Sequence, residues 1–337
     1  MNRKFAVAAT ALWLASAGMR LAAADEPKLL KLATLAPEGS GWMKLFHEWA
    51  HNIEEKSGGR IKVKLYAGGV AGDERDVVRK MRLGQLNGGA VTAIGLGLIQ
   101  PEVRVLEVPF IMRSYDELDY VRNSLDGELR KKFEDKGYVL LGWGDVGPVH
   151  LFTNSPPVSK QALLQMKFWA WTDDPIVRTL FQEIGISGVP LGVPDVLPSL
   201  QTGMINACYG SPLSTLALQW QSKVKYITSM VISQSIGATV VTKKAWDDLG
   251  PELQKIVMDA SKELEKKLLK TVRADNETAL TKMKAQGLVV TETPPELQKE
   301  FQMHAAVVAQ KLEGALYSHE FRARVDGLLA TYRATHK

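Results

Sequence analysis

Cysteine is almost missing from this sequence, because Cys208 is the only one among 337 residues. An internal disulfide is therefore excluded, and the fold has to rest on hydrophobic cores. The chain is long enough to bury two such cores. The single thiol, which neighbours Tyr209, is more readily a buried structural group than a nucleophile.

Long apolar runs are also missing after the first residues. Residues 5–18 form an apolar stretch behind a short basic start, but this stretch is too short to span a bilayer comfortably. Small residues follow at positions 22–24, in the order expected of a cleavable secretory signal. We therefore predict a signal peptide over residues 1–24 and a periplasmic protein. A membrane anchor is the alternative interpretation of the same stretch.

Charge of one sign is scarce. The chain carries 42 basic and 37 acidic residues, which gives a net charge of +5. Residues 1–24 hold three of the basic residues and none of the acidic ones, so the exported chain would carry only +2. A charge so small and dispersed argues against a nucleic-acid partner.

Motifs for nucleotide binding and nucleophilic catalysis are missing too: there is no P-loop, no G-x-S-x-G and no G-x-G-x-x-G after a strand. One metal-like motif is present, His47-Glu48-x-x-His51. On a helix it sets two imidazoles on one face with a glutamate as general base, and Glu74 would be a third ligand. The apolar stripe of this helix falls at positions 46, 49, 50 and 53, which leaves both histidines toward the polar side. We expect that the protein is not an enzyme and that it binds neither a cofactor nor a metal. A zinc metallopeptidase is the alternative.

What the sequence does contain is an alternation of strand and helix patterns, which is typical of an α/β fold. Helices are expected over residues 41–56, behind the capping residue Ser40, and over 73–83 and 195–202. Strands are expected at residues 28–35, 61–66, 90–94, 138–143, 150–153, 166–171, 205–208 and 238–242. The glycine-containing stretch 144–148 would be the crossover into a second lobe, and the strand at 238–242 would return to the first.

The longest feature lies near the C-terminus. Pro251 suits a helix start, and no proline or glycine follows it until Gly287. This permits a helix of about 36 residues, or roughly 54 Å at 1.5 Å per residue. Such a helix exceeds one small domain, so we expect it to span both lobes. Two further helices are expected over residues 296–315 and 320–331.

Four stretches resemble one family, the solute-binding proteins of tripartite ATP-independent periplasmic (TRAP) transporters, which are DctP-like. They are residues 57–63 (SGGRIKV), 108–111 (VPFI), 197–206 (LPSLQTGMIN) and 246–254 (WDDLGPELQ). The resemblance implies a two-lobed periplasmic binding protein fold, with crossing strands and a long helix spanning both lobes. It also implies a cleft that closes on a small ligand, most often an organic acid, and delivery to a TRAP-type membrane permease.

On this resemblance we divide the chain into a signal peptide and two lobes. Lobe I is predicted to comprise residues 25–147 plus 236–268, and lobe II residues 148–235 plus 269–337. We expect the protein to act as a monomer.

One departure from the family concerns the ligand. The family carries an arginine on a strand of the second lobe, whose guanidinium holds the ligand carboxylate through two hydrogen bonds. In the matching stretch here, residues 166–171 (MKFWAW), Trp169 occupies that position. Alternation places Lys167, Trp169 and Trp171 on the face expected to line the cleft. A second cationic position of the family falls on Val149, and the adjacent His150 would point the other way.

The missing arginine favours a ligand that is neutral, large and largely apolar or aromatic. An organic-acid ligand held by a different cation is one alternative, and a cationic ligand over the indoles is another. Both tryptophans could instead be core residues. The residues expected to touch the ligand are Trp169, Trp171, Thr172, Tyr209, Ser211, Pro37, Trp42 and Ile94.

Overall fold

A computed structural model describes residues 26–336, so the predicted signal peptide lies outside the described residues. Its strands follow the order β2–β1–β3–β9–β4–β7–β5–β6, and β8 joins the sheet through β4 and carries β10. One group of strands comprises β1 (Lys28–Thr34), β2 (Ile61–Tyr66), β3 (Gly88–Thr92), β4 (Tyr138–Thr153) and β9 (Ser233–Thr242). The other comprises β5 (Phe168–Trp171), β6 (Gly188–Leu191), β7 (Ala207–Gly210), β8 (Tyr226–Thr228) and β10 (Val289–Thr291).

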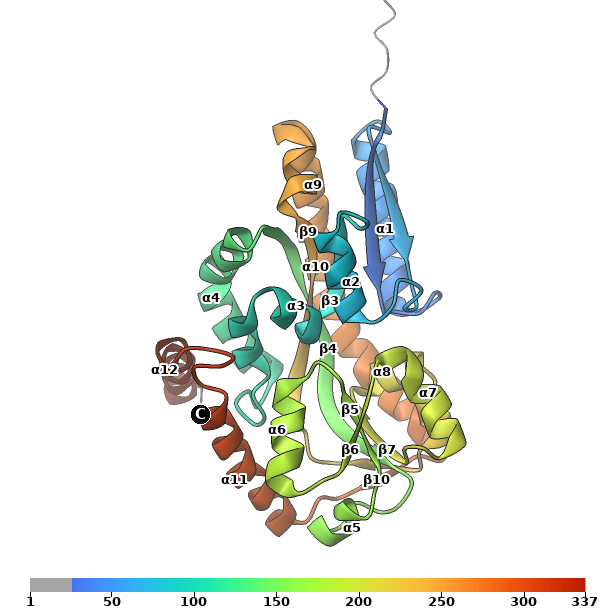
Figure 1. The fold of residues 1–337 in the computed structure, drawn as a ribbon, viewed down its shortest axis with the longest axis vertical. Coiled ribbons are helices and arrows are strands. Elements are labelled where there is room, and N and C mark those ends of the chain that lie inside the picture. Colours follow the sequence, from blue (N-terminus) through green and yellow to red (C-terminus); the bar gives the residue numbers. More distant parts are fainter. Residues whose placement is uncertain (1–25, 337) are drawn as a thin grey trace, which may run out of the picture.

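Strand β4 connects the two groups (Figure 1). It pairs antiparallel with β9 from the Tyr138–Thr242 pair to the Val149–Ser233 pair, and its last residues pair with β7 and β8. The prediction of crossing strands is confirmed. The strands expected at residues 138–143 and 150–153 are a single 16-residue strand, because residues 144–148 continue it beside β9.

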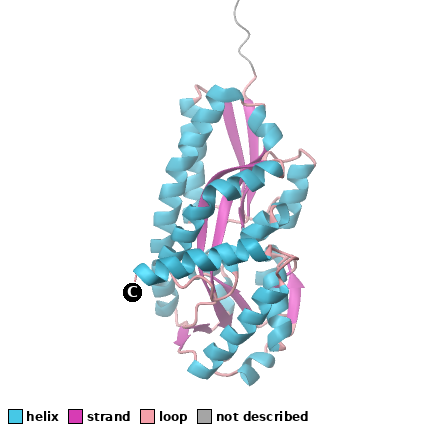
Figure 2. Cartoon of the chain, turned by 90° about the vertical axis from the view of Figure 1, so that its left-hand side faces the viewer, coloured by secondary structure: helices cyan, strands magenta, loops and turns pink. Residues whose placement is uncertain are grey.

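The long helix is confirmed as α10 (Gly250–Ala285), with 36 residues. It packs against α1 (Gly41–Lys56), β4 and α8 (Pro212–Ala217), and so reaches elements on both sides of the crossing strands. Figures 1 and 2 show the helices arranged around the outside of the strands.

Helix α1 forms as its sequence predicts. The hydroxyl of Ser40 caps it by accepting from the Met43 N–H at 3.3 Å, and Ser57 ends it. Phe46, Trp49 and Ile53 are buried, and each such side chain contributes roughly 1.5–3 kcal/mol of stability.

The remaining helices cover the other faces of the strands. They are α2 (Glu74–Arg82), α3 (Ala93–Ile99), η1 (Pro101–Glu107), α4 (Tyr115–Asp135), α5 (Lys160–Leu164), α6 (Pro175–Ile184), α7 (Val193–Thr202), η2 (Trp220–Lys223), α9 (Lys243–Asp247), α11 (Pro295–Lys311) and α12 (His319–Thr335). Helix α11 packs on α6 and α12 packs on α4, so the C-terminal helices contact both halves of the molecule. The lobe boundaries given above stay a prediction.

The strand expected over residues 90–94 ends earlier, at Thr92. The Thr92 hydroxyl accepts from the Ile94 N–H at 3.2 Å and caps α3, so the chain turns into a helix there. Ile94 therefore lies in the first turn of α3 and not on a strand.

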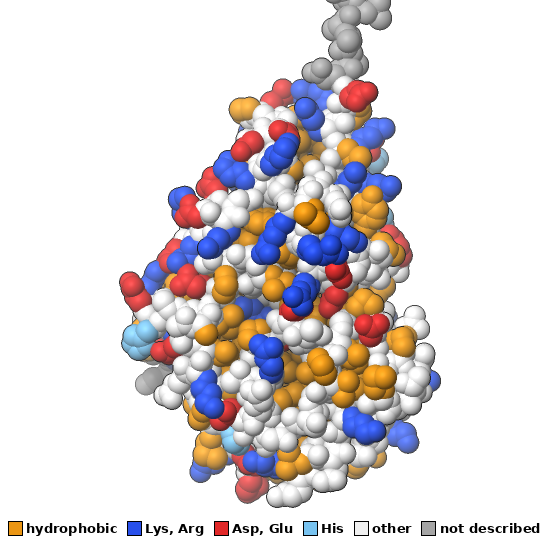
Figure 3. All heavy atoms as spheres, viewed as in Figure 1, with side chains coloured by type: hydrophobic (Ala, Val, Ile, Leu, Met, Phe, Trp, Pro, Cys, Tyr) orange, Lys and Arg blue, Asp and Glu red, His pale blue; other side chains and the backbone are white. Residues whose placement is uncertain are grey.

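Two features of the whole chain bear on its setting. Within residues 26–336, none of the helices combines the length and the apolar character that crossing a membrane requires. On the face drawn in Figure 3, basic and acidic side chains are interspersed, and hydrophobic side chains are more frequent over its lower half.

Candidate functional site

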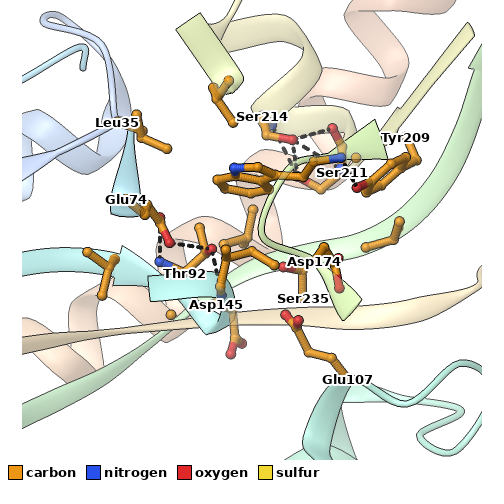
Figure 4. A pocket seen from close by; sticks show the side chains of 18 of the residues that line it. Leu35, Glu74, Thr92, Glu107, Asp145, Asp174, Tyr209, Ser211, Ser214 and Ser235 are labelled. Atoms are coloured by element: carbon orange, nitrogen blue, oxygen red, sulfur yellow. Dashed lines mark hydrogen bonds between the residues drawn. The ribbon is translucent and has the colours of Figure 1, made fainter. Parts of the chain in front are cut away.

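A cavity of about 200 Å³ lies where the two groups of strands meet. Its wall is mostly apolar and comes from β1, β3, η1, β4, β5, α6, β7 and β9, so both sides of the crossing strands contribute (Figure 4). An apolar cavity of about 150 Å³ is enough to admit benzene. The space therefore fits a molecule of one ring and a few further atoms.

Four aromatic side chains form one wall of this cavity, and we call them the aromatic cluster: Trp169, Trp171, Tyr209 and Trp220. The Trp169 ring stacks on Tyr209 at 4.7 Å, meets Trp220 edge-on at 5.1 Å and lies 5.6 Å from Trp171. Each such pair contributes about 0.5–1.5 kcal/mol beyond its buried area. These contacts between rings therefore stabilise the position of the wall.

The indole N–H groups of Trp169 and Trp171 are already engaged within the protein. Trp169 donates its Nε1–H to the Leu191 carbonyl at 2.9 Å, and Trp171 donates its Nε1–H to Asp73 Oδ2 at 2.7 Å. The Tyr209 hydroxyl accepts from the Trp171 backbone N–H at 3.1 Å. Because indole has only one N–H donor, both tryptophans present only carbon to the cavity.

The structure places seven of the eight predicted site residues along the cavity. They are Trp169, Trp171, Tyr209, Ser211, Pro37, Trp42 and Ile94, whereas Trp220 was not predicted. Thr172 is exposed and is not among the lining residues, because the chain turns away after β5. Whether these side chains touch a ligand stays a prediction.

The predicted cleft face of β5 is only partly right. Trp169 and Trp171 line the cavity, but Lys167 is exposed and lies before β5 begins. Trp169 is only 2% exposed, so most of its ring supports its aromatic neighbours. Val149 lines the cavity as expected, and His150 instead places its Nδ1 2.8 Å from the Thr228 carbonyl.

A buried ionic group, absent from the predictions, also lines the cavity. This Arg104 cluster consists of Arg104, Glu107 and Asp174. Arg104 Nη2 lies 2.8 Å from Asp174 Oδ1 and 3.4 Å from Glu107 Oε2. Burial acts to lower the pKa of Arg104, but the two carboxylates outweigh it and hold that pKa above its usual value. Burial raises the pKa of Glu107, against the opposing effect of Arg104.

Local structure explains how these three residues meet. In the 3-10 helix η1, residues three apart project on the same side, which brings Arg104 beside Glu107. Asp174 caps α6 by accepting from the Ile176 and Val177 N–H groups at 3.0 and 3.3 Å. The sequence carries a signal for the first pair, since an arginine and a glutamate three residues apart interrupt an otherwise apolar stretch.

Contacts across the cleft hold the cavity closed. Trp171 reaches Asp73 before α2, Arg104 reaches Asp174, and the Arg75 and Asp173 side chains lie 3.4 Å apart. Each contact joins a residue that precedes β4 to one that follows it. The structure is thus a closed form.

The H-E-x-x-H motif does not assemble a metal site in residues 26–336, where no three potential ligands gather. His47 is more than half exposed and lies 3.1 Å from Glu38, while Glu48 pairs with Lys267 on α10 at 3.1 Å. Glu74, the supposed third ligand, accepts instead from the Thr92 and Gly95 N–H groups at 2.7 and 2.6 Å.

Comparison with solved structures supports the fold. The chain superposes on a Ralstonia eutropha TRAP periplasmic solute-binding protein with bound (S)-2-acetolactate, with a TM-score of 0.83, 22% identity and 90% and 99% of the two chains covered. It also superposes on DctP7 of Bordetella pertussis, an extracytoplasmic solute receptor binding pyroglutamic acid, with a TM-score of 0.82, 21% identity and the same coverage.

Sequence relatives agree. The chain is 24% identical over 287 residues to the C4-dicarboxylate-binding periplasmic protein DctP of Rhodobacter capsulatus, covering 83% of this chain and 84% of that one. It is 23% identical to the 2,3-diketo-L-gulonate-binding periplasmic protein YiaO of Escherichia coli, over 71% and 73% of the two chains.

The model of one family, described as bacterial extracellular solute-binding protein, family 7 (DctP), matches residues 32–314 and confirms the resemblance seen in the four sequence stretches. The chain belongs to this family of extracytoplasmic proteins, which bind small ligands, work with the membrane permease components of TRAP transporters and are not enzymes.

Proposed function

We propose that this protein captures an uncharged, largely apolar or aromatic small molecule in the cavity and passes it to a TRAP-type permease. The observation that carries the proposal is the aromatic cluster along the cavity, which includes Trp169, the residue matched in the sequence to the family's carboxylate-binding arginine. Apolar surface removed from water contributes roughly 25 cal/mol per Å², so such a wall binds by burial and not by charge.

The charges around the cavity argue against an acidic ligand. Among residues 26–336, Arg104 is the only basic residue that lines it, and Glu107 and Asp174 lie against this guanidinium. An incoming carboxylate would meet both of these carboxyl groups at short range in a medium of low dielectric constant. An organic acid held by Arg104 is therefore the second candidate, favoured only by the presence of that cation.

The proposed mechanism is closure around β4 and β9. A ligand that touches both sides of the cleft stabilises the closed state, and only this difference in contacts shifts the population. We also propose that residues 1–24 are removed on export and that the protein acts as a monomer.

The test uses the protein purified from the periplasm without refolding. Native mass spectrometry is expected to show a retained organic molecule that carries no net charge once identified. Calorimetry of ligand-stripped protein is expected to show no binding of succinate, whereas the Trp169→Arg variant, which restores a cation at that position, should gain measurable binding. Micromolar or tighter binding of succinate by the native protein would contradict the proposal.

A further inference from the structure

The buried guanidinium of Arg104 has donors that the protein leaves unused. We infer that Arg104 is the polar anchor of the bound ligand, and that it takes an uncharged acceptor oxygen such as a carbonyl or ether. The inference rests on the proposed function, since it adds one polar group to a ligand proposed to be otherwise apolar.

The hydrogen bonding of Arg104 supports its role as the polar anchor. Arg104 is 2% exposed, and its Nη2 serves Asp174 and Glu107. Its Nε and Nη1 have no hydrogen-bond acceptor among the described residues, although both atoms are buried. Arginine carries only donors, and an unpaired buried donor is costly, so a ligand that supplies an acceptor recovers a bond.

The charge balance of the Arg104 cluster supports an uncharged acceptor oxygen in the ligand. Asp174 alone offsets the charge of Arg104, so the Arg104 cluster carries no net positive charge whether or not Glu107 is ionised. A carboxylate ligand would be a second or third anion beside one cation and would be repelled. A neutral oxygen accepts the same hydrogen bonds without that cost.

Position supports the inference as well. Asp174 caps α6, on the other side of the crossing strands from η1, so the cluster exists only when the cleft is closed. Figure 4 shows Asp174, Glu107 and Ser235 near one another along the cavity that the aromatic cluster also lines. One small molecule could therefore place a ring against the aromatic cluster and an oxygen toward Arg104.

Four probes of nearly equal shape test this: acetophenone, ethylbenzene, benzoate and benzylamine. Their dissociation constants are measured by ligand-observed NMR titration of protein stripped by unfolding and refolding. Acetophenone is expected to bind on the order of tenfold more tightly than ethylbenzene, because it adds a hydrogen bond to a charged donor. Benzoate and benzylamine are expected to bind more weakly than acetophenone.

Two variants assign the effect to the Arg104 cluster. Arg104→Lys keeps the charge but not the donors at Nε and Nη1, so the preference for acetophenone over ethylbenzene should disappear. Glu107→Gln removes one negative charge with little change of shape, so benzoate should gain relative to acetophenone. Arg324→Lys, an exposed arginine on α12, is the matched control and should leave all four affinities unchanged.

The outcomes separate this inference from the proposed function. Equal affinities for acetophenone and ethylbenzene would overturn the role of Arg104 and leave the apolar ligand standing. Tightest binding of benzoate, lost in Arg104→Lys, would overturn both in favour of an acid. Tightest binding of benzylamine would also overturn both, as would failure of all four probes to bind.

Discussion

The carboxyl group of Glu74 is enclosed where α2, β3 and α3 meet. Burial raises its pKa to about 7, although the Thr92 and Gly95 donors act in the opposite direction. In the unfolded chain the same group titrates near 4.5. Between these values the native protein keeps a proton that the unfolded chain gives up. The contribution of Glu74 to stability is therefore full below pH 4.5 and falls as the pH rises to 7.

Replacement of Glu74 by glutamine should remove this pH dependence. The free energy of unfolding of the native protein, relative to Glu74→Gln, is expected to fall by about 3 kcal/mol between pH 4.5 and 7. Urea unfolding of both proteins across this range measures the difference. Glu54→Gln, an exposed glutamate on α1, should run parallel to the native protein, and parallel behaviour of Glu74→Gln would refute the expectation.

Trp169 supports the cavity wall more than it faces the ligand. Trp169→Ala should lose the stacking on Tyr209 and lower ligand affinity at least tenfold, with a cost in stability of about 3–5 kcal/mol. Trp169→Phe keeps an aromatic face and should retain most binding. Native mass spectrometry compares the fraction of each protein that retains ligand. Trp246→Ala, at a tryptophan outside the cavity, is the control, and unchanged retention in Trp169→Ala would contradict the role assigned to the ring.

At this scale the sequence predicted apolar partners better than charged ones. Alternation along residues 166–171 put Trp169 and Trp171 on one face, and the family resemblance implied that this face lines the cavity. Arg104 was missed, because its role depends on Asp174, which is 70 residues away and meets it only through the tertiary fold.

Among the elements, α10 is joined to both β4 and α8 by Asn276. Asn276 on α10 donates to the Val146 carbonyl at 3.1 Å and accepts from the Leu213 N–H of α8 at 3.0 Å. It lies against Gly147, where the pairing of β4 with β9 shifts register. A bulge of this kind bends a strand, which suits the part of the chain around which the lobes are proposed to move.

Gly147 should not tolerate a side chain. Its φ is +123°, and a Cβ there would lie 2.4 Å from Asn276 Nδ2, so Gly147→Ala combines backbone strain with displacement of the asparagine. We expect a loss of at least about 2 kcal/mol in the free energy of unfolding by urea. Gly144→Ala is the matched control in the same strand, because its Cβ would meet nothing closer than Leu268 Cδ1 at 3.8 Å. Equal stability of the two variants would contradict the expectation that Gly147 cannot carry a side chain.

The local sequence pattern predicted some elements better than others. Helix α10 was predicted at almost its full length, because neither proline nor glycine interrupts it. Strand β4 was predicted as two pieces, since Gly144 and Gly147 are typical of turns. Pairing with β9 along its length outweighs that local preference, and such pairing cannot be read from the residues of β4 alone.

In the whole molecule, few polar contacts close the cleft, and the two halves share a hydrophobic core. The larger cluster of buried hydrophobic residues runs from α2 and α4 to α6 and α11, so it continues past the cleft. Across the cleft, Trp171 donates to Asp73 Oδ2, and a Cβ on Gly192 would lie 2.9 Å from the same oxygen. Asp73 therefore fits closely against the opposite side, and we expect it to act as a latch that keeps the cleft closed.

Removal of this carboxylate should favour the open form. A hydrogen bond to a charged acceptor contributes about 1.5–3 kcal/mol, so Asp73→Ala should shift the closed-to-open ratio roughly 10- to 100-fold toward open. Without ligand, small-angle X-ray scattering should then report a larger radius of gyration than for the native protein. Asp76→Ala removes the same charge three residues further along, within α2, but Asp76 pairs with Arg79 on that helix and not across the cleft, so it should leave the radius unchanged. An unchanged radius for Asp73→Ala would mean that the shared core, and not the latch, sets the closed state.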